Sequence, residues 1–379
     1  MRIRILAGRL DRVTGGRHYN RELSIRLAER GHEVSVVCID RPAGMPNNLA
    51  LYSIEPFKGT STRWLWRLEA LQSQRYYEAQ LRALRLEKPD IVVAASEYFS
   101  RVHWMLYPDV PWIYLPHAMI TTDDVERGAS SIAYYASTVL AEMMQKWALN
   151  NATVTVRFTK YSCDELSRHY GGGVKPRFFV NPVGIERPSG LRRSRDSHRA
   201  RFLYVGSLIA RKRLRVAIEA LQNLRSRNWI FNIVGDGAER QSLEALVRDA
   251  GLSEQVHFRG FHDDPSFWYE NSDLFLFPSQ SESLGLVVLE AMSFGVPSLV
   301  IRADGIDTHN PYEEIIENES DGFIAQSRGD FSRVLSRLYD NWEVVENAAR
   351  IARETSRRFS WSMHLERYES LFSSLMISR

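Results

Sequence analysis

Residues 278–297 read PSQSESLGLVVLEAMSFGVP, and this stretch decides the fold. The apolar run Leu274–Phe277 ends just before it, and a polar loop then leads into a helix expected near Gly285. Free N–H groups at a helix start form an anion site, and glycine lets a phosphate approach closely. Glu282 precedes this helix and Glu290 lies on it. The stretch predicts a phosphate site between two carboxylates; the alternative is an ordinary strand–loop–helix unit with surface acids.

The spacing of Glu282 and Glu290 fits a long ligand. Eight residues span about 12 Å if they are helical, which is about the reach of a nucleotide-sugar from ribose to sugar. Retaining glycosidases instead hold their two carboxylates about 5 Å apart. We therefore predict two binding carboxylates, one at each end of the ligand, and no covalent intermediate.

Apolar runs alternate with helical stretches on both sides of a polar segment, residues 187–200, which is rich in Pro, Gly and Arg and is the predicted linker. This rhythm is typical of parallel sheets with crossover helices. The predicted fold is α/β, with two doubly wound, Rossmann-like domains at 1–186 and 201–358. Their ligands bind where the carboxyl ends of the strands face a shared cleft. Apolar residues at helical spacing predict a final helix over 359–379.

Composition excludes several classes of protein. The chain has 379 residues, 44% hydrophobic and 25% charged, as in globular proteins. Its apolar runs are far shorter than the roughly 20 residues of a membrane span, and no signal peptide is expected at the N-terminus. The two cysteines predict a reduced, cytoplasmic protein. No nucleic-acid module is found, so nucleic acid is not an expected partner.

These residues resemble the retaining glycosyltransferases of the GT-B fold, most of all glycosyltransferase family 4, whose E-x7-E signature Glu282 and Glu290 match. Further landmarks follow in the family's order, densely from 200 to 300 and thinly between 40 and 175: Gly15-Gly16, 180–186, 205–212, 234–237 and 258–261. The resemblance implies two domains around a central cleft, with the C-terminal helix crossing back to the first.

The resemblance implies transfer of a sugar from a nucleoside-diphosphate sugar to an acceptor hydroxyl, with retention and without metal or other cofactor. Lys212 would neutralise the leaving diphosphate, Glu282 would hold the sugar hydroxyls, and His117 would contact the sugar or the acceptor. The other donor contacts would be Gly15, Gly16, Gly206, Arg211, Gly235, Arg259, Gly285, Leu286 and Glu290, the last on the ribose.

Some of these assignments have plainer alternatives: a solvated basic loop at Lys212, a simple turn at Gly15-Gly16, and a buried structural histidine at His117. Gly15-Gly16 lacks the G-x-G-x-x-G spacing, so NAD is not predicted. The acidic run Asp123-Asp124-Val-Glu126 is interpreted as an exposed loop, although it superficially resembles a metal cluster.

Two departures from the family pattern affect the site. Ser207 stands where the family often has arginine, so Arg211 or Arg213 is expected to supply the second phosphate contact. Ala303-Asp-Gly305 resembles the family's sugar-facing loop, but the segment Ile306–Tyr312 that follows is longer than usual.

Two other functions fit the same residues. A nucleotide-sugar 2-epimerase of the GT-B fold would need no acceptor, and would form an epimer from the donor alone. A non-catalytic nucleotide-binding module would release no nucleoside diphosphate; the set Lys212, Glu282 and Glu290 argues against it.

A helix is predicted over Arg63–Leu86, with five arginines on one face and residues such as Ala79 and Ala83 packed on the sheet. Each arginine near an anionic bilayer contributes on the order of 1 kcal/mol. This face predicts peripheral association with the inner face of the membrane and a lipid-linked saccharide acceptor from cell-surface glycan, polysaccharide or lipopolysaccharide biosynthesis. The alternatives are an ordinary solvated helix face and a soluble saccharide acceptor.

Overall fold

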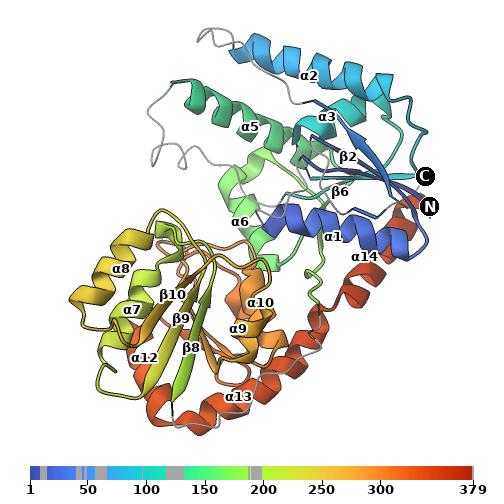
Figure 1. Ribbon diagram of the computed structural model, residues 1–379. Helices are drawn as coiled ribbons and strands as arrows, with labels where there is room; N and C mark the ends of the chain where they lie inside the picture. The colour runs from blue at the N-terminus through green and yellow to red at the C-terminus, as the bar shows by residue number, and fades with distance from the viewer. Residues whose placement is uncertain are drawn as a thin grey trace. The chain divides into compact units, whose positions relative to one another are not determined.

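The structure, a computed structural model, describes residues 1–8, 15–39, 45–46, 49–55, 66–95, 97–116, 132–186, 188 and 199–377. It divides into two compact units (Figure 1). Unit 1 comprises Met1–Phe158, Ser162–Asn181 and Leu365–Arg379, and unit 2 comprises Thr159–Tyr161 and Pro182–His364. Each unit is an α/β sandwich built around its own parallel sheet, as the sequence predicts.

Unit 1 contains a seven-stranded parallel sheet in the order β3-β2-β1-β4-β5-β6-β7. Its strands are β1 (Arg2–Leu6), β2 (Glu33–Cys38), β3 (Ala50–Ser53), β4 (Ile91–Ala94), β5 (Trp112–Tyr114), β6 (Val154–Arg157) and β7 (Phe178–Val180). The helices that accompany them are α1 (Gly15–Glu29), α2 (Trp66–Ala83), α3 (Glu97–Leu106), α5 (Ile132–Asn151) and α6 (Lys160–Tyr170). The central strands are nearly continuous apolar runs because helices cover both faces of the sheet.

Unit 2 contains a six-stranded parallel sheet in the order β10-β9-β8-β11-β12-β13. Its strands are β8 (Ala200–Val205), β9 (Trp229–Val234), β10 (Val256–Gly260), β11 (Leu274–Phe277), β12 (Ser298–Ile301) and β13 (Phe323–Ala325). Its helices are α7 (Leu214–Gln222), α8 (Arg240–Asp249), α9 (Ser266–Glu270), α10 (Leu286–Ser293), α11 (Tyr312–Ile315), α12 (Arg328–Asp340) and α13 (Trp342–Thr355). The strand order reverses between β8 and β11, the switch point at which ligands of such sheets bind.

The last helix, α14 (Trp361–Ile377), begins in unit 2 and, from Leu365 onward, belongs to unit 1. There the Tyr368 hydroxyl lies 3.3 Å from the Tyr19 hydroxyl of α1, and Tyr368 and Phe372 are fully buried. Burial raises the pKa of both tyrosines far above their ordinary range. This segment of α14 therefore completes the core of unit 1.

The helix predicted over Arg63–Leu86 is α2, which begins at Trp66 and ends at Ala83. The predicted buried side is wrong, because Ala79 and Ala83 are exposed while Leu81 is buried. Arg75, Arg82 and Arg85 of the predicted basic face are exposed, as expected, and Arg63 and Arg67 lie outside the residues whose side chains are described. Arg85 lies beyond the helix with a positive φ of 45°. No helix in the described part of the chain is long and apolar enough to cross a membrane.

Candidate active site

Two glycines bring the backbone turns after β8 and β9 into direct contact. Gly206 follows β8 and Gly235 follows β9, with φ values of +152° and +138°. A Cβ added to Gly235 would lie 1.9 Å from the carbonyl oxygen of Gly206. Only glycine fits this position, so the surface at these strand ends is formed by bare backbone, which a phosphate can approach.

Lys212 and Glu282 meet beside the switch point. Lys212 ends a short 3-10 turn (Ala210–Lys212), and its Nζ forms an ion pair with Oε1 of Glu282 on the loop after β11. The hydroxyl of Ser279 donates to the same oxygen at 2.6 Å, and the two charged side chains are only 14% and 10% exposed. A carboxylate with two such donors is held in one orientation.

Two tyrosines lie close to this ion pair. Tyr204 donates its hydroxyl to the carbonyl of Ser207 at 2.9 Å, and Tyr312 lies against Gly285 at the start of α10. Burial, and secondarily the charge of Glu282, raises the pKa of both tyrosines well above the ordinary range, so both are neutral donors. The Tyr312 hydroxyl has no hydrogen-bond partner among the described residues and is an available donor.

Glu290 lies one turn into α10 and is half-buried. Its Oε2 accepts a hydrogen bond from the buried Tyr269 hydroxyl at 3.0 Å. Burial raises the pKa of Glu290 and the bond from Tyr269 partly offsets the shift. Since α10 begins only at Leu286, the residues from Glu282 to Gly285 are loop, and the 12 Å helical separation that the sequence suggests does not apply.

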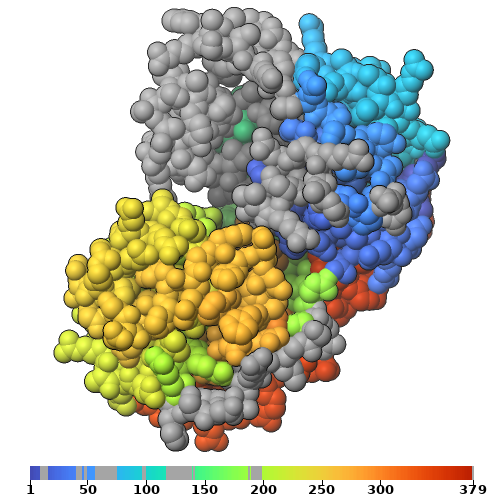
Figure 2. All heavy atoms as spheres, viewed as in Figure 1, coloured from blue at the N-terminus to red at the C-terminus, as the bar shows by residue number. Residues whose placement is uncertain are grey.

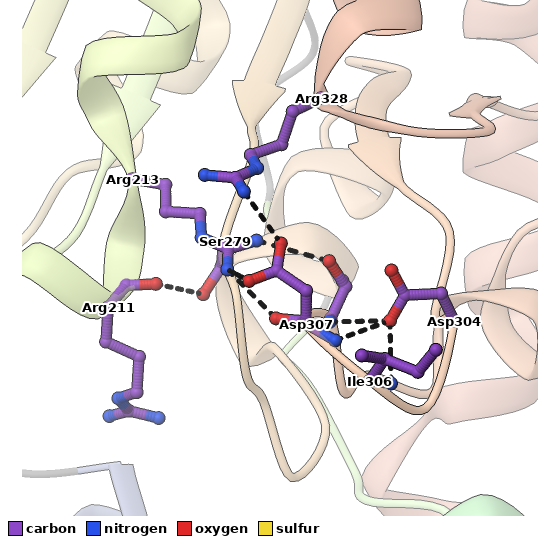
Figure 3. A network of polar contacts seen from close by, with 8 residues as sticks. Arg211, Arg213, Ser279, Asp304, Ile306, Asp307 and Arg328 are labelled. Atoms are coloured by element: carbon purple, nitrogen blue, oxygen red, sulfur yellow. Dashed lines mark hydrogen bonds and ion pairs between the residues drawn. The ribbon is translucent and has the colours of Figure 1, made fainter.

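The two arginines considered for the second phosphate contact have different roles. Arg213 is engaged elsewhere: its guanidinium donates to the carbonyl and carboxylate of Asp307 at 2.9 and 2.6 Å, and to Thr308 Oγ1 at 3.2 Å (Figure 3). Arg211 is exposed and donates to the carbonyl of Ser281 at 2.8 Å. Arg211 therefore remains beside the Glu282 loop, and Arg213 is held by the neighbouring loop.

The remaining donor-side candidate in unit 2 is Arg259 on β10. Its Nε donates to Asn232 Oδ1 at 2.8 Å, and its guanidinium lies 5.1 Å from the ring centroid of Trp268. Phe261 and Phe267 nearby are 72% and 57% exposed. This part of the chain, gold in Figure 2, lies at the surface of unit 2.

In unit 1, Gly15 and Gly16 open α1. His117 and the acidic run Asp123–Glu126 lie outside the described residues. Within the described ranges, no group of three or more His, Cys, Asp or Glu residues could hold a metal ion.

Four residues of the site escaped the sequence interpretation: Tyr204, Ser279, Tyr269 and Tyr312. Ser279 stands three residues before Glu282 in the quoted stretch, so its hydroxyl could have been noticed. Tyr269 and Tyr312 reach α10 only through tertiary packing, which leaves no local signal.

Comparison with known proteins agrees with this geometry. Residues 13–187 match Glycosyltransferase Family 4, and residues 192–355 match Glycosyl transferases group 1. A D-inositol 3-phosphate glycosyltransferase of Paenarthrobacter aurescens is 25% identical over 393 residues, which cover 95% of this chain and 94% of that protein.

Two solved structures show the same fold. WaaG, a glycosyltransferase involved in lipopolysaccharide biosynthesis, has a TM-score of 0.70 at 19% identity, covering 94% of this chain and 95% of its own. Anabaena HepE in complex with UDP and glucose has a TM-score of 0.69 at 17% identity, covering 98% of this chain and 100% of its own. The two family matches together span nearly the whole chain, which therefore belongs to glycosyltransferase family 4 and is a glycosyltransferase of the GT-B fold.

Proposed function

We propose that this glycosyltransferase moves a sugar from a nucleoside-diphosphate sugar to an acceptor hydroxyl with retention of anomeric configuration. The ion pair of Lys212 and Glu282 at the β8–β11 switch point carries the proposal. In this proposal the Lys212 ammonium binds the diphosphate and the neighbouring Glu282 carboxylate binds the sugar hydroxyls. Gly206 lies on the loop that carries Lys212, the amides that begin at Leu286 follow the loop that carries Glu282, and Gly235 follows the neighbouring strand β9.

When the donor binds, Lys212 and Glu282 separate and each contacts the donor instead. Lys212 turns its ammonium to the diphosphate, Arg211 supplies the second contact in place of the arginine missing at Ser207, and Glu282 accepts from the sugar hydroxyls. Glu290 accepts from the ribose hydroxyls while the Tyr269 hydroxyl holds it in place. Arg259 and the glycine turns lie toward the nucleoside, and Gly15, Gly16 and His117 act from the first domain.

The reaction separates charge. The bond between the anomeric carbon and the diphosphate oxygen breaks, and its electron pair leaves with the diphosphate. The acceptor oxygen forms its new bond on the same face of the sugar, and its proton passes to an oxygen of the leaving phosphate. Lys212, Arg211 and the α10 amides stabilise the developing negative charge without metal. Glu282, engaged by Lys212 and Ser279, serves as a binding carboxylate rather than a nucleophile.

We propose a saccharide or lipid-linked saccharide of the cell surface as acceptor, in keeping with the involvement of WaaG in lipopolysaccharide biosynthesis. Exposed arginines on and just after α2, Arg75, Arg82 and Arg85, support a peripheral position at the anionic inner face of the membrane. Arg82 is paired with Glu78 at 2.8 Å, which reduces the net charge of this face.

The proposal is tested by incubating the purified chain with a panel of nucleotide-sugars and saccharide acceptors. Nucleoside diphosphate should appear in step with acceptor loss, and NMR of the product should show the anomeric configuration of the donor. An epimer formed from the donor alone would indicate a 2-epimerase instead. Nucleotide binding without diphosphate release in any combination would indicate a binding module.

A further inference from the structure

The loop between β12 and α11 is bonded to the loop that carries Glu282. We call residues 304–309 the bracing loop. The His309 amide donates to the carbonyl of Gln280 at 2.7 Å, and the Glu282 amide donates to the carbonyl of His309 at 2.9 Å. The Gln280 amide in turn donates to the carbonyl of Arg211 at 2.8 Å. Backbone bonds therefore join three loops that are far apart in sequence.

The side chain of Arg213 also joins the bracing loop to the loop that carries Lys212. Arg213 follows Lys212 directly, is only 9% exposed, and donates to Asp307 and Thr308 of the bracing loop. The second carboxylate oxygen of Asp307 pairs with Arg328 of α12 at 3.2 Å (Figure 3). Asp307 and Thr308 are thus bonded to the residue that follows Lys212, and the adjacent His309 is bonded to the loop that carries Glu282.

The bracing loop is itself a tight turn. Asp304 Oδ1 accepts from the amides of Ile306, Asp307 and Thr308 at 2.8–2.9 Å, and these bonds lower the pKa of Asp304 to about 2. The amides of Asp304 and Gly305 donate back to the carbonyl of Thr308. These internal bonds hold residues 304–308 in one conformation.

The backbone of Arg213 is unusual. Its φ of 50° and ψ of 33° are left-handed, a conformation that glycine adopts without strain and arginine does not. From this left-handed position the Arg213 guanidinium makes three hydrogen bonds to the bracing loop.

Resting on the proposed function, we propose that Arg213 and Asp307 are positioning residues. Their ion pair fixes the bracing loop, and the bracing loop sets the position of the Lys212 ammonium relative to the Glu282 carboxylate. Neither residue touches the substrate; both act through the two that do. The long segment after Gly305 is accordingly part of the transfer machinery of this chain.

The first test separates the effect of backbone strain at Arg213 from the effect of its side-chain contacts. Arg213→Gly removes the guanidinium and relieves the left-handed strain, so the variant should melt no lower than wild type. Its kcat should nevertheless fall about 10–100-fold, the scale of a small misplacement of catalytic groups, with donor KM changed about threefold or less. Wild-type kcat in Arg213→Gly would overturn the proposal.

Glu319→Gly is the matched control. Glu319 also has a positive φ, 68°, and also forms an arginine–carboxylate pair, with Arg337 at 2.6 Å, in the turn before β13. This variant should keep the wild-type kcat. An equal loss of kcat in both glycine variants would mean that the effect is general and not specific to the bracing loop.

The second test measures coupling. Arg213→Ala and the Arg213→Ala/Asp307→Ala double variant should lose the same factor in kcat, because the Asp307 carboxylate acts on the site through Arg213. Asp307→Ala alone should lose that factor or less, because Arg213 keeps its bonds to the Asp307 carbonyl and to Thr308 Oγ1. Losses that multiply in the double variant would contradict the ion pair as their cause.

Hydrogen exchange distinguishes failure of this inference from failure of the proposed function. The amides of Gln280, Glu282 and His309 should exchange about tenfold faster or more in Arg213→Gly and in Asp307→Asn, but not in Glu319→Gly. This readout needs no donor or acceptor. Unchanged exchange rates would refute the positioning role of Arg213 and Asp307, even if the enzyme is active. Faster exchange in a chain that shows no sugar transfer would refute only the proposed function.

Discussion

Lys212 and Glu282 are 70 residues apart in the chain, and their side chains form an ion pair beside the boundary between β8 and β11. Each residue follows a strand of the sheet, and the two strands are neighbours. Ligands of such sheets bind at the switch point between these strands, so the pair lies where a ligand is expected.

Removing the Lys212 ammonium should reduce turnover more than donor affinity. Lys212→Ala should lower kcat by about 10²–10³, the scale for loss of one preorganised charge-stabilising donor. Steady-state kinetics at saturating donor measures this. Arg215→Ala, which removes an exposed cation three residues away, is the control and should keep kcat. Near-normal turnover in Lys212→Ala would assign the diphosphate to Arg211.

Donor binding should weaken at low pH because the Glu290 carboxylate becomes protonated. Its pKa is raised by burial, so affinity for nucleoside diphosphate should fall as the pH drops through that raised value and the carboxylate becomes protonated. Glu290→Ala should cost about 1.5–3 kcal/mol of binding at neutral pH. Calorimetric titration measures both effects, and an affinity within twofold of wild type would refute the ribose assignment.

The Tyr269 hydroxyl should set the pH at which donor affinity is lost. Its hydrogen bond stabilises the carboxylate and lowers the pKa of Glu290, so Tyr269→Phe should move the loss of affinity to higher pH. Tyr339→Phe, which removes a hydroxyl bonded to Asn228 instead, should leave the pH profile in place. An unchanged profile in Tyr269→Phe would mean that Glu290 does not control binding.

A methyl group at Gly235 should disrupt the strand-end turns. Gly235→Ala should lose at least about 2 kcal/mol of stability, because its Cβ would overlap the Gly206 carbonyl and its φ is positive. Gly172→Ala is the control, since its Cβ would meet nothing within 4 Å. Denaturant unfolding distinguishes them, and equal midpoints would contradict the close approach.

Truncation of Phe372 should destabilise unit 1. Phe372 is fully buried, and its replacement by alanine should cost about 3–5 kcal/mol. The exposed neighbour Ser373 should tolerate alanine within about 0.5 kcal/mol. Calorimetry should show the lower transition only in Phe372→Ala; wild-type melting would show that α14 contributes little to this core.

Membrane association should depend on charge. Sedimentation with anionic vesicles should retain the chain at low salt, and release it as salt rises. Replacing Arg75, Arg82 and Arg85 with glutamate should abolish retention, whereas the same change at Arg215, Arg225 and Arg227 of unit 2 should not. No retention of the wild type at low salt would favour a soluble acceptor.

The sequence predicted the sheets well because buried parallel strands are recorded locally as apolar runs, as at Leu274–Phe277. It also located the loops carrying Lys212 and Glu282. The sequence could not show which of Arg211 and Arg213 is available for the phosphate. That depends on the tertiary contact between Arg213 and Asp307 of the bracing loop, which leaves Arg211 beside the Glu282 loop. It misjudged the buried side of α2, since a helix's orientation is set by packing against its neighbours rather than by charge pattern alone.

The division of α14 between the two units has a consequence for how the chain can be cut. Cleavage between Glu186 and Arg199 would yield a first fragment without Tyr368 and Phe372, and a second fragment carrying them with their apolar faces uncovered. Each piece alone should be poorly soluble, and co-expression should rescue both. Two plasmids encoding the two pieces would then restore activity only in cells where both fragments are made, which makes this helix a natural basis for a complementation reporter.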